Sequence, residues 1–491
     1  MMLNEMIESI RVKERSNYRD IEITGISIDS RLVKEGELYV AVKGHELDGH
    51  DFIDQAIGRG AAALVLGRSY GSALPTIIVD DTATAVALLA RTFFGDPVSK
   101  LVLVGITGTN GKTSASFLLR SIMSETRGPS GLIGTVGFGC GDDLSAATHT
   151  TPSSVDLFRI MSEFLEQGCT SVAMEVSSHA AVQGRIAGLE FDVGVFTNIS
   201  RDHLDYHGSI EEYVAAKEVF VTSLTDPERS KEPGTLAFNI DDPQVLEVKS
   251  RFAGRAVSFG FGENATVRGE NLVADLEGTS FDLVCGEERT RIDLKLLAAF
   301  SAFNALAAAA AAHALGIGIR SIKRGLERVD QVPGRFQVLS TGRGPKVVVD
   351  YAHTPDALER LLTFCRDLGP ARITTVFGCG GDRDRGKRPI MGRIAAEISD
   401  EVYVTDDNPR TEDPDRIVEE ILSGIEGSAH VERDRGSAIR KAIMGADEGE
   451  LVVIAGKGHE NCQIVGTERL PFDDVREVLA ALKTREVEDQ D

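Results

Sequence analysis

A glycine-rich turn that ends in a lysine and a threonine follows a short apolar run near the start of the second hundred residues. Residues 100–113 read KLVLVGITGTNGKT. A strand that passes through such a turn into a helix points backbone N–H groups at an anion, while the lysine offsets phosphate charge and the hydroxyl can bind Mg²⁺. We therefore expect ATP or GTP to bind here. The residues expected to contact the nucleotide are Gly108, Thr109, Asn110, Gly111, Lys112 and Thr113.

The spacing of this turn differs from that of the usual P-loop. Gly105 and Gly111 are separated by five residues instead of four, and Gly108 adds a glycine inside the turn. The order of strand, glycines, lysine and hydroxyl is still the one that phosphate binding requires. An ordinary strand–turn–helix is the less favoured alternative.

Polar side chains also follow the next two apolar runs. Glu175 ends the run at 171–175, and the segment FTNISRDHLDYHG at 196–208 places Asn198 at the end of the run at 191–199 and His203 just beyond it. Because hard divalent cations prefer oxygen ligands, Glu175 is a candidate ligand for Mg²⁺ beside the phosphates. The alternatives are a strand-end carboxylate paired with a surface lysine and a plain loop with helix-capping aspartates.

The apolar runs and the segments between them predict three α/β domains. We expect a small N-terminal α/β domain at 1–98, a central mononucleotide-binding sheet of the P-loop type at 99–333, and a C-terminal Rossmann-like, doubly wound domain at 334–491. Proline and glycine in DQVPGR at 330–335 mark a hinge. Ligands of such sheets bind at the carboxyl ends of strands, so the candidate residues should meet in the crevice between domains.

Composition excludes several classes of protein. The chain of 491 residues has a formal net charge of −23, which opposes binding to nucleic acid or to anionic membranes. No apolar run is long enough to span a bilayer, and the N-terminus lacks a signal-peptide core. We expect a globular cytoplasmic protein that binds no nucleic acid and does not insert into membranes.

The cysteines are scattered, without a CxxC pair. This spacing favours reduced thiols and suggests neither a zinc site nor a disulfide framework. The six are Cys140, Cys169, Cys285, Cys365, Cys379 and Cys462.

The turn TGTNGKT at 107–113 and the segment at 196–208 resemble the Mur ligase family. These are ATP-dependent, amide-forming enzymes of peptidoglycan precursor synthesis, with folylpolyglutamate synthetases as relatives. Motifs in all three predicted domains follow the order of the family. The resemblance implies a monomeric ligase that uses ATP and two Mg²⁺ ions, forms an acyl phosphate and releases ADP and phosphate.

The resemblance also gives roles to residues that would be unremarkable on their own. It makes His203 a metal ligand beside Glu175 and Thr113. It makes Lys217, which alone reads as an exposed helix lysine, a carbamoylated side chain that helps hold a second Mg²⁺, because the modification turns a cation into an anion. The residues implied in catalysis are Lys112, His203, Lys217 and Arg335, and the nucleotide contacts implied outside the turn are Asn198, Asn304, Arg335 and Asp350. At Ser301 the family often has asparagine, which puts one contact in doubt.

Two substrate sites follow from the resemblance. The UDP-muramoyl dipeptide is expected at hydroxyls, an amide and a guanidinium near the strand ends. The residues are Ser30, Thr150, Thr151, Ser177, Gln183 and Arg185.

The sequence DNPR at 407–410 resembles the version of this motif in the Mur ligases that add meso-diaminopimelate. Diaminopimelate has a second carboxylate, which a guanidinium fork binds in a bidentate manner, whereas the bare ammonium of lysine would be repelled. A lysine-adding Mur ligase and a folylpolyglutamate synthetase-like ligase are the alternatives within this class. Two alternatives come from other classes of protein. A P-loop GTPase would carry the motif NKxD, which reads the guanine base, and this sequence does not contain it. A non-enzymatic nucleotide-responsive regulator would bind nucleotide but would not release phosphate in a substrate-dependent way. The implied pocket contains Arg383, Asp407, Asn408, Pro409, Arg410, Gly456 and Glu460.

Overall fold

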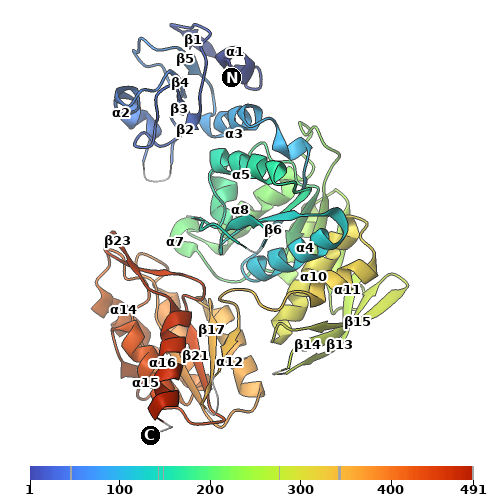
Figure 1. The fold of residues 1–491 in the computed structure, drawn as a ribbon, viewed down its shortest axis with the longest axis vertical. Helices are drawn as coiled ribbons and strands as arrows, with labels where there is room; N and C mark the ends of the chain where they lie inside the picture. Colours follow the sequence, from blue (N-terminus) through green and yellow to red (C-terminus); the bar gives the residue numbers. More distant parts are fainter. Residues whose placement is uncertain (45–46, 142, 148, 276, 341–343, 489–491) are drawn as a thin grey trace.

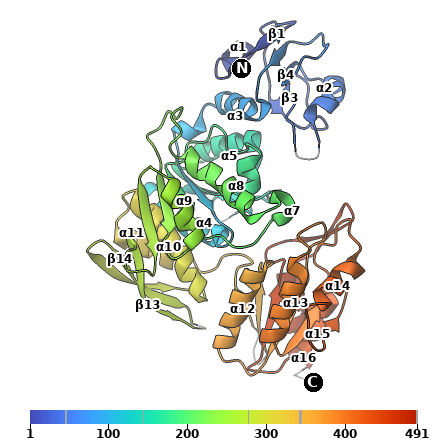
Figure 2. The same ribbon diagram turned by 180° about the vertical axis from the view of Figure 1, so that it is seen from behind.

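The computed structural model describes residues 1–44, 47–141, 143–147, 149–275, 277–340 and 344–488 (Figure 1). Three large sheets follow one another along the chain, with five, ten and six strands. The ten-stranded sheet lies between the other two, as Figure 1 and the reverse view in Figure 2 show. This arrangement confirms the predicted α/β fold with three domains, while the boundaries at 98/99 and 333/334 stay predictions.

The N-terminal domain is built on a five-stranded sheet with the order β1-β5-β4-β3-β2. All strand pairs are parallel except β1 with β5. Its elements are α1 (Leu3–Ile7), β1 (Glu14–Ser16), β2 (Ile26–Ser27), β3 (Leu38–Val40), the 3-10 helix η1 (Gly49–Phe52), α2 (Ile53–Gly58), β4 (Ala63–Leu66), β5 (Thr76–Ile78) and α3 (Thr82–Phe93). A second 3-10 helix, η2 (Pro97–Ser99), leads into the central domain.

The central domain has β6 inside its sheet, between β10 and β9, in the order β15-β14-β13-β12-β11-β10-β6-β9-β7-β8. Apolar side chains of β6 alternate between the two faces, one packed against α5 and α8 and the other against α4, α10 and α11. Its first elements are β6 (Val102–Thr107), α4 (Lys112–Arg127), β7 (Ser130–Ile133), β8 (Phe138–Cys140), α5 (Ser154–Glu166), β9 (Ser171–Glu175), α6 (Ser178–Val182), β10 (Val193–Phe196), α7 (Leu204–His207) and α8 (Ile210–Ser223).

The second half of this domain extends the sheet with an antiparallel meander, β13 to β15. The alanine-rich helix α10 is buried, because its small side chains let it pack closely on the sheet and on α4. The remaining elements are β11 (Thr235–Asn239), α9 (Pro243–Arg251), β12 (Ala256–Gly260), β13 (Val267–Ala274), β14 (Thr279–Cys285), β15 (Glu288–Leu294), α10 (Ala299–Ala314) and α11 (Ile319–Glu327).

The C-terminal domain is doubly wound, as predicted. Its sheet has the order β16-β17-β21-β18-β19-β20, with α12, α13 and α14 packed on one face and α15 and α16 on the other. Its elements are β16 (Gln337–Leu339), β17 (Lys346–Asp350), α12 (Pro355–Asp367), β18 (Ile373–Phe377), α13 (Lys387–Ile398), β19 (Glu401–Val404), α14 (Pro414–Leu422), β20 (His430–Val431), α15 (Arg435–Met444), β21 (Leu451–Ala455), the hairpin β22 (Cys462–Val465) and β23 (Glu468–Pro471), and α16 (Asp474–Glu488). None of the helices described is both long and apolar enough to cross a lipid bilayer.

Cys140 and Cys169 are joined by a disulfide, so the prediction of six reduced thiols is wrong for this pair. Cys140 ends β8 and Cys169 precedes β9, and α5 brings the two segments together, with Cα atoms 6.8 Å apart. A pairing across 29 residues depends on the path of the chain and has no local sequence signal. The other four cysteines are thiols.

An ion pair at the seam between the N-terminal and central domains is expected to stabilise the fold in a pH-dependent way. Arg91 Nη1 lies 2.6 Å from Glu190 Oε1, and the backbone N–H of Lys231 donates to Glu190 Oε2 at 2.7 Å. Burial by itself would raise the pKa of Glu190, but these hydrogen bonds outweigh it and lower the pKa to about 2. A carboxylate with a lowered pKa contributes its full stability above about pH 4.5, the ordinary value, and loses it as the pH falls toward 2.

We predict that Glu190→Gln lowers the unfolding free energy by about 2 kcal/mol near neutral pH, because it removes a charged hydrogen-bond acceptor. The midpoint of thermal unfolding, measured for both proteins between pH 7 and pH 3, should differ most at the upper end and converge toward the lower end. Glu163→Gln, at an exposed pair on α5, is the matched control and should have little effect. A difference in unfolding midpoint between the two proteins that stays constant from pH 7 to pH 3 would contradict the pH-dependent contribution of Glu190.

Candidate functional site

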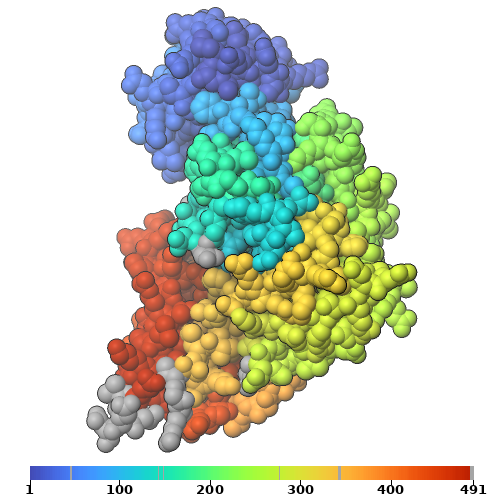
Figure 3. Space-filling model, turned by 45° about the vertical axis from the view of Figure 1, so that its right-hand side comes forward, coloured from blue at the N-terminus to red at the C-terminus, as the bar shows by residue number. Residues whose placement is uncertain are grey.

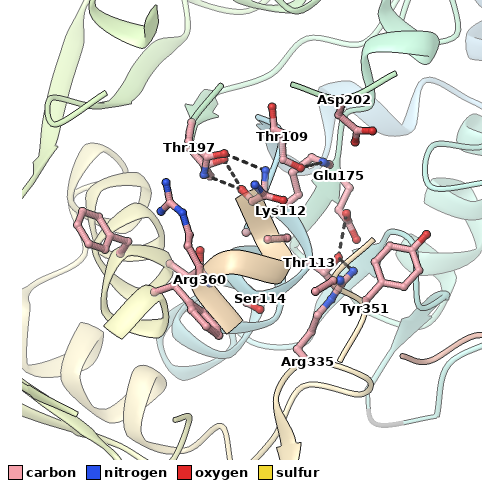
Figure 4. A pocket seen from close by; sticks show the side chains of 18 of the residues that line it. Thr109, Lys112, Thr113, Ser114, Glu175, Thr197, Asp202, Arg335, Tyr351 and Arg360 are labelled. Atoms are coloured by element: carbon pink, nitrogen blue, oxygen red, sulfur yellow. Dashed lines mark hydrogen bonds between the residues drawn. The ribbon is translucent and has the colours of Figure 1, made fainter. Parts of the chain in front are cut away.

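A cavity of about 500 Å³ lies where the central and C-terminal domains meet (Figure 4). The space-filling view in Figure 3 shows the central domain between the other two. Most of the predicted nucleotide and metal residues line this one cavity. They are Thr109, Asn110, Gly111, Lys112, Thr113, Glu175, Asn198, His203, Lys217, Asn304, Arg335 and Asp350.

The turn after β6 has a backbone that only glycine fits at two positions. Gly108 has a φ of +138°, and a Cβ there would lie 1.9 Å from Thr197 Oγ1. Gly111 has a φ of +85°, and a Cβ there would lie 2.2 Å from Asn304 Oδ1. The glycines therefore let the turn pack between β10 and α10.

Asn198, predicted as a residue of the nucleotide pocket, also holds the turn in place. Its carbonyl accepts from the N–H of Thr109 at 2.8 Å, and its Oδ1 accepts from the N–H of Asn110 at 2.9 Å. Thr197 Oγ1 donates to the carbonyl of Asn110 at 2.7 Å. The end of β10 thus fixes the conformation of the turn.

Lys112 begins α4 and lies inside the turn. Its Nζ donates to the carbonyls of Gly108 and Thr109, both at 2.9 Å. Burial lowers its pKa, and Glu175 and Asp202 oppose that shift. The first turn of a 16-residue helix and a partly buried ammonium together favour an anion at this position.

Glu175, at the end of β9, joins the turn to the C-terminal domain through Thr113. Thr113 Oγ1 donates to Glu175 Oε2 at 3.1 Å, and Arg335 Nη2 donates to Thr113 Oγ1 at 2.9 Å. Figure 4 shows Arg335 reaching toward Thr113 from the C-terminal side. Thr135 also donates to both carboxylate oxygens, through its N–H at 2.8 Å and its hydroxyl at 3.0 Å.

Lys217 on α8 is buried, with 1% of its surface exposed, so its reading as an exposed helix lysine is wrong. Its Nζ donates to the carbonyl of Gly108 at 2.8 Å and lies 4.4 Å from the centre of the Tyr213 ring. Within the described chain no carboxylate comes within ion-pair distance of this amine. Burial, and then the charge of Lys112, lower the pKa of Lys217 well below its ordinary value.

His203 and Asp202 lie at the seam between the two domains. His203, with a φ of +53°, precedes α7, and its Nε2 lies 3.3 Å from Asp202 Oδ2. Burial lowers the pKa of His203 to about 3, so the ring is neutral near pH 7. Asp202 Oδ2 is also 3.9 Å from Nε2 of His353, and Asn110 Nδ2 donates to Asp356 Oδ2 at 2.9 Å. Residues of the turn and of its neighbours therefore contact the C-terminal domain directly.

Asp350, predicted as a nucleotide contact, lines the cavity, but its carboxylate is already bound by backbone N–H groups. Its two carboxylate oxygens accept from the N–H groups of Phe336 and Ala352, both at 2.7 Å. Burial raises its pKa, and Arg335 opposes that shift. In the structure this carboxylate holds the turn that carries Arg335.

Five of the six residues predicted for the muramoyl substrate gather beside Glu175. Arg185 donates to the carbonyl of Thr151 at 2.9 Å and to Gln183 Oε1 at 2.6 Å, and Thr151 Oγ1 donates to the carbonyl of Glu175 at 2.8 Å. Ser177 and Thr150 line the cavity. Ser30 instead lies in the N-terminal domain, where its hydroxyl donates to Gln55 Oε1 at 2.6 Å.

The residues predicted for the amino-acid substrate gather at the carboxyl ends of β18, β19 and β21. Two arginines lie near each other there: a Cβ on Gly380 would lie 2.8 Å from Arg410 Nη1 and 3.6 Å from Arg383 Cγ. Burial, and then the charge of Arg383, lower the pKa of Arg410. Beside them, Asn408 Nδ2 donates to Glu460 Oε2 at 2.8 Å. The other members, Asp407, Pro409 and Gly456, occupy the same two loops, and a Cβ on Gly456 would lie 2.9 Å from Asp407 Oδ2.

Four residues around these sites were not singled out from the sequence. Thr135 follows β7 in a segment without any motif, so no local signal identifies it. Asp202 stands inside the segment 196–208, His353 stands three residues after Asp350, and Lys457 stands between Gly456 and Glu460. For these three, a charged residue within a strand-end motif was the available signal.

The oxygen atoms of Thr113 and Glu175 suit Mg²⁺, which prefers one or two carboxylates together with phosphate oxygens and water. The ammonium of Lys217 does not suit a cation, but a carbamate at the same atom does. In the part of the chain that is described, no group of three or more His, Cys, Asp or Glu side chains forms a metal-binding cluster.

Comparisons with known proteins match all three domains. Residues 22–93 match the model described as Mur ligase family, catalytic domain, residues 106–312 match the Mur ligase middle domain, and residues 334–458 match the Mur ligase, glutamate ligase domain. The UDP-N-acetylmuramoyl-L-alanyl-D-glutamate--2,6-diaminopimelate ligase of Geobacillus kaustophilus is 42% identical over 94% of this chain and 96% of its own. The enzyme of the same name from Listeria monocytogenes is 39% identical over 99% of both chains.

Solved structures agree with these matches. A structure of a UDP-N-acetylmuramoyl-L-alanyl-D-glutamate--2,6-diaminopimelate ligase is 33% identical, with a TM-score of 0.66 over 94% of this chain and 95% of that one. The MurF ligase from Thermotoga maritima in complex with ADP, at 20% identity, shares the fold with a TM-score of 0.66 over 96% of this chain and all of its own. With identity near 40% over almost the full length and all three domain models in order, this chain belongs to the Mur ligase family.

Proposed function

We propose that this protein is the ATP-dependent ligase that adds meso-diaminopimelate to UDP-N-acetylmuramoyl-L-alanyl-D-glutamate in peptidoglycan precursor synthesis. The observation that carries the choice of amino acid is that Arg410 lies close enough to Arg383 and to Glu460 to feel the charge of both, while Asn408 donates to Glu460. The distal end of diaminopimelate carries both a carboxylate and an ammonium. Two cations and one anion at the end of a pocket complement that end of the molecule, whereas lysine would leave the guanidiniums without a partner.

The first chemical step uses the cavity between the domains. The glutamyl carboxylate of the muramoyl substrate attacks the γ-phosphorus of ATP, a new C–O–P linkage forms, and the bond to the β-phosphate oxygen breaks to release ADP. The attacking group is already an anion, so no general base is needed. Lys112, Arg335 and the N-terminus of α4 offset the negative charge that collects around the γ-phosphate, and their fixed positions are the main source of catalysis.

The second step forms the amide bond. The neutral amine of diaminopimelate attacks the acyl carbon, its proton is lost, and inorganic phosphate leaves. The acyl phosphate forms in the central domain, while the proposed amino-acid pocket lies in the C-terminal domain. The contacts from Arg335 to Thr113 and from Asn110 to Asp356 support a closed arrangement in which the two sites face each other.

We propose Thr113, Glu175 and His203 as ligands for two Mg²⁺ ions, with Lys217 as a carbamate. When bound, Mg²⁺ neutralises phosphate charge. Glu175 is held by Thr135 and Thr113, so its carboxylate has a fixed direction. The lowered pKa keeps the imidazole of His203 neutral, which is the form that binds a cation.

Carbamoylation of Lys217 requires an amine without its proton, because only the neutral nitrogen attacks CO₂. Burial beside Lys112 favours that form. We predict that protein incubated with carbon-13 bicarbonate gives a carbamate carbon resonance that Lys217→Arg lacks. Lys100→Arg, at an exposed lysine, is the matched control and should keep the resonance. Equal spectra for wild type and Lys217→Arg would contradict the modification.

The function is tested by phosphate release with ATP and the UDP-muramoyl dipeptide. We expect release to depend on meso-diaminopimelate and to be at least about 100-fold less efficient with L-lysine, as a buried polar site rejects ligands that leave it unpaired. Activity with lysine alone would overturn the choice of amino acid. Nucleotide binding without any substrate-dependent release would overturn the assignment as a ligase.

We further propose that the protein acts in the cytoplasm as a monomer. Its net charge of −23 and the resemblance of the complete chain to ligases of small substrates support this setting.

A further inference from the structure

Lys457 is a fully buried lysine on the loop that follows β21, with none of its side chain exposed. It stands between Gly456 and Glu460, two residues of the proposed amino-acid pocket. Placing an ammonium in a protein interior costs free energy unless hydrogen bonds and opposite charges compensate. The partners of Lys457 therefore indicate what its burial achieves.

The three side chains that surround the ammonium of Lys457 all belong to the proposed amino-acid pocket. Nζ donates to Asn408 Oδ1 at 3.0 Å and to Glu460 Oε2 at 2.8 Å, and it lies 3.6 Å from Asp407 Oδ1. An ammonium has three N–H donors and no acceptor, so it suits a set of oxygen atoms. Lys457 thereby links the loop after β19 to the loop after β21.

The contact with Asn408 fixes which way its amide faces. Oδ1 accepts from Lys457 Nζ and also from the N–H of Ile464 at 2.9 Å. A flipped amide would turn its NH₂ toward two donors, which is unfavourable. The NH₂ is therefore directed at Glu460 Oε2, to which it donates at 2.8 Å.

The contact with Glu460 occupies one oxygen of that carboxylate. Both Lys457 and Asn408 donate to Oε2, while the side chain of Glu460 keeps 29% of its surface exposed. Oε1 is thus left to accept from a ligand ammonium. The other buried cation nearby, Arg435, is paired with Asp474 at 2.7 and 2.8 Å and does not replace Lys457.

We propose that Lys457 is a positioning residue for the amino-acid substrate. It holds Glu460 and Asn408 so that one carboxylate oxygen meets the distal ammonium, while Arg383 and Arg410 meet the distal carboxylate. Lys457 itself touches neither the substrate nor the reacting atoms. This inference rests on the proposed function, since it concerns the pocket assigned to diaminopimelate.

The test is steady-state kinetics of the full-length enzyme with Lys457→Met, which keeps the length of the side chain and removes its charge. We expect the KM for meso-diaminopimelate to rise about tenfold or more, the range for loss of a buried charged contact. The KM values for ATP and the UDP-muramoyl dipeptide should stay within about twofold of wild type. A side chain that served stability alone would lower the yield of folded enzyme without this selective change.

Lys441→Met, at an exposed lysine of the same domain that pairs with Glu432, is the matched control and should leave all three KM values unchanged. If Lys457→Met does not fold, Lys457→Arg carries the test, because it keeps the charge but moves the donors, and the same selective rise in KM is expected. A KM for meso-diaminopimelate unchanged in every folded variant overturns the inference. Wild-type enzyme that does not respond to meso-diaminopimelate at all would instead overturn the proposed function.

Discussion

Replacing Lys112 with alanine is expected to lower kcat/KM for phosphate release by about 10³-fold, the cost of removing a preorganised group that stabilises charge in a transition state. The effect should be this large because Lys112 is a partly buried cation inside the turn, at the N-terminus of α4. The value of kcat/KM for ATP is obtained from phosphate release at saturating meso-diaminopimelate while the ATP concentration is varied.

The control for this prediction is Lys100→Ala, at a lysine just before β6 whose ammonium binds only the carbonyl of Gly95 in the described contacts. It should retain full activity. Thermal unfolding of both variants separates loss of catalysis from loss of fold. Lys112→Ala enzyme that is folded and still forms the amide bond at the wild-type rate would contradict the phosphate-binding role of the turn.

Replacing Arg410 with alanine is expected to raise the KM for meso-diaminopimelate on the order of 100-fold, because the distal carboxylate would lose a bidentate partner in a partly buried site. Arg410→Lys keeps the charge but not the fork, so a smaller rise is expected. The preference over L-lysine should fall in parallel, since lysine never uses this contact. The measurement is kcat/KM for both amino acids with each variant.

Arg416→Ala is the matched control, at an exposed arginine on α14, and should leave both values unchanged. The φ of Arg410 is +52°, and its backbone pairs with β22. The backbone conformation of the loop therefore sets the direction of the side chain together with its rotamer. An Arg410→Ala enzyme with an unaltered preference for meso-diaminopimelate would show that another group reads the distal carboxylate.

The signals from which the sequence predicts a nucleotide site are local. A buried parallel strand, glycines at positive φ and a lysine at the start of a helix each constrain neighbouring residues, and the structure places Gly108, Gly111 and Lys112 accordingly. The strand-end rule predicted that Glu175 would face the crevice between domains, and the resemblance gave Arg335 as a contact from the C-terminal domain. The two side chains meet through Thr113.

Other features depend on long-range packing and carry no such signal. The burial of Lys217 arises because α8 packs behind the turn, and nothing in its own helix distinguishes it from a surface lysine. The contacts of Thr135 to Glu175 and of Lys457 to Asn408 join loops that are 40 and 49 residues apart. Ser301, where the family often has asparagine, donates from α10 to the carbonyl of Leu297, two residues before that helix begins. Its own hydroxyl therefore serves the start of that helix.

The central claim is that an acid group is phosphorylated by ATP before an amine captures it. The most direct test uses UDP-muramoyl dipeptide labelled with oxygen-18 in the glutamyl carboxylate, with mass spectrometry of the phosphate released during turnover with meso-diaminopimelate. The attacking oxygen becomes the bridge of the acyl phosphate and leaves with the phosphorus, so each phosphate should carry one labelled oxygen atom. Phosphate without the label would contradict the account.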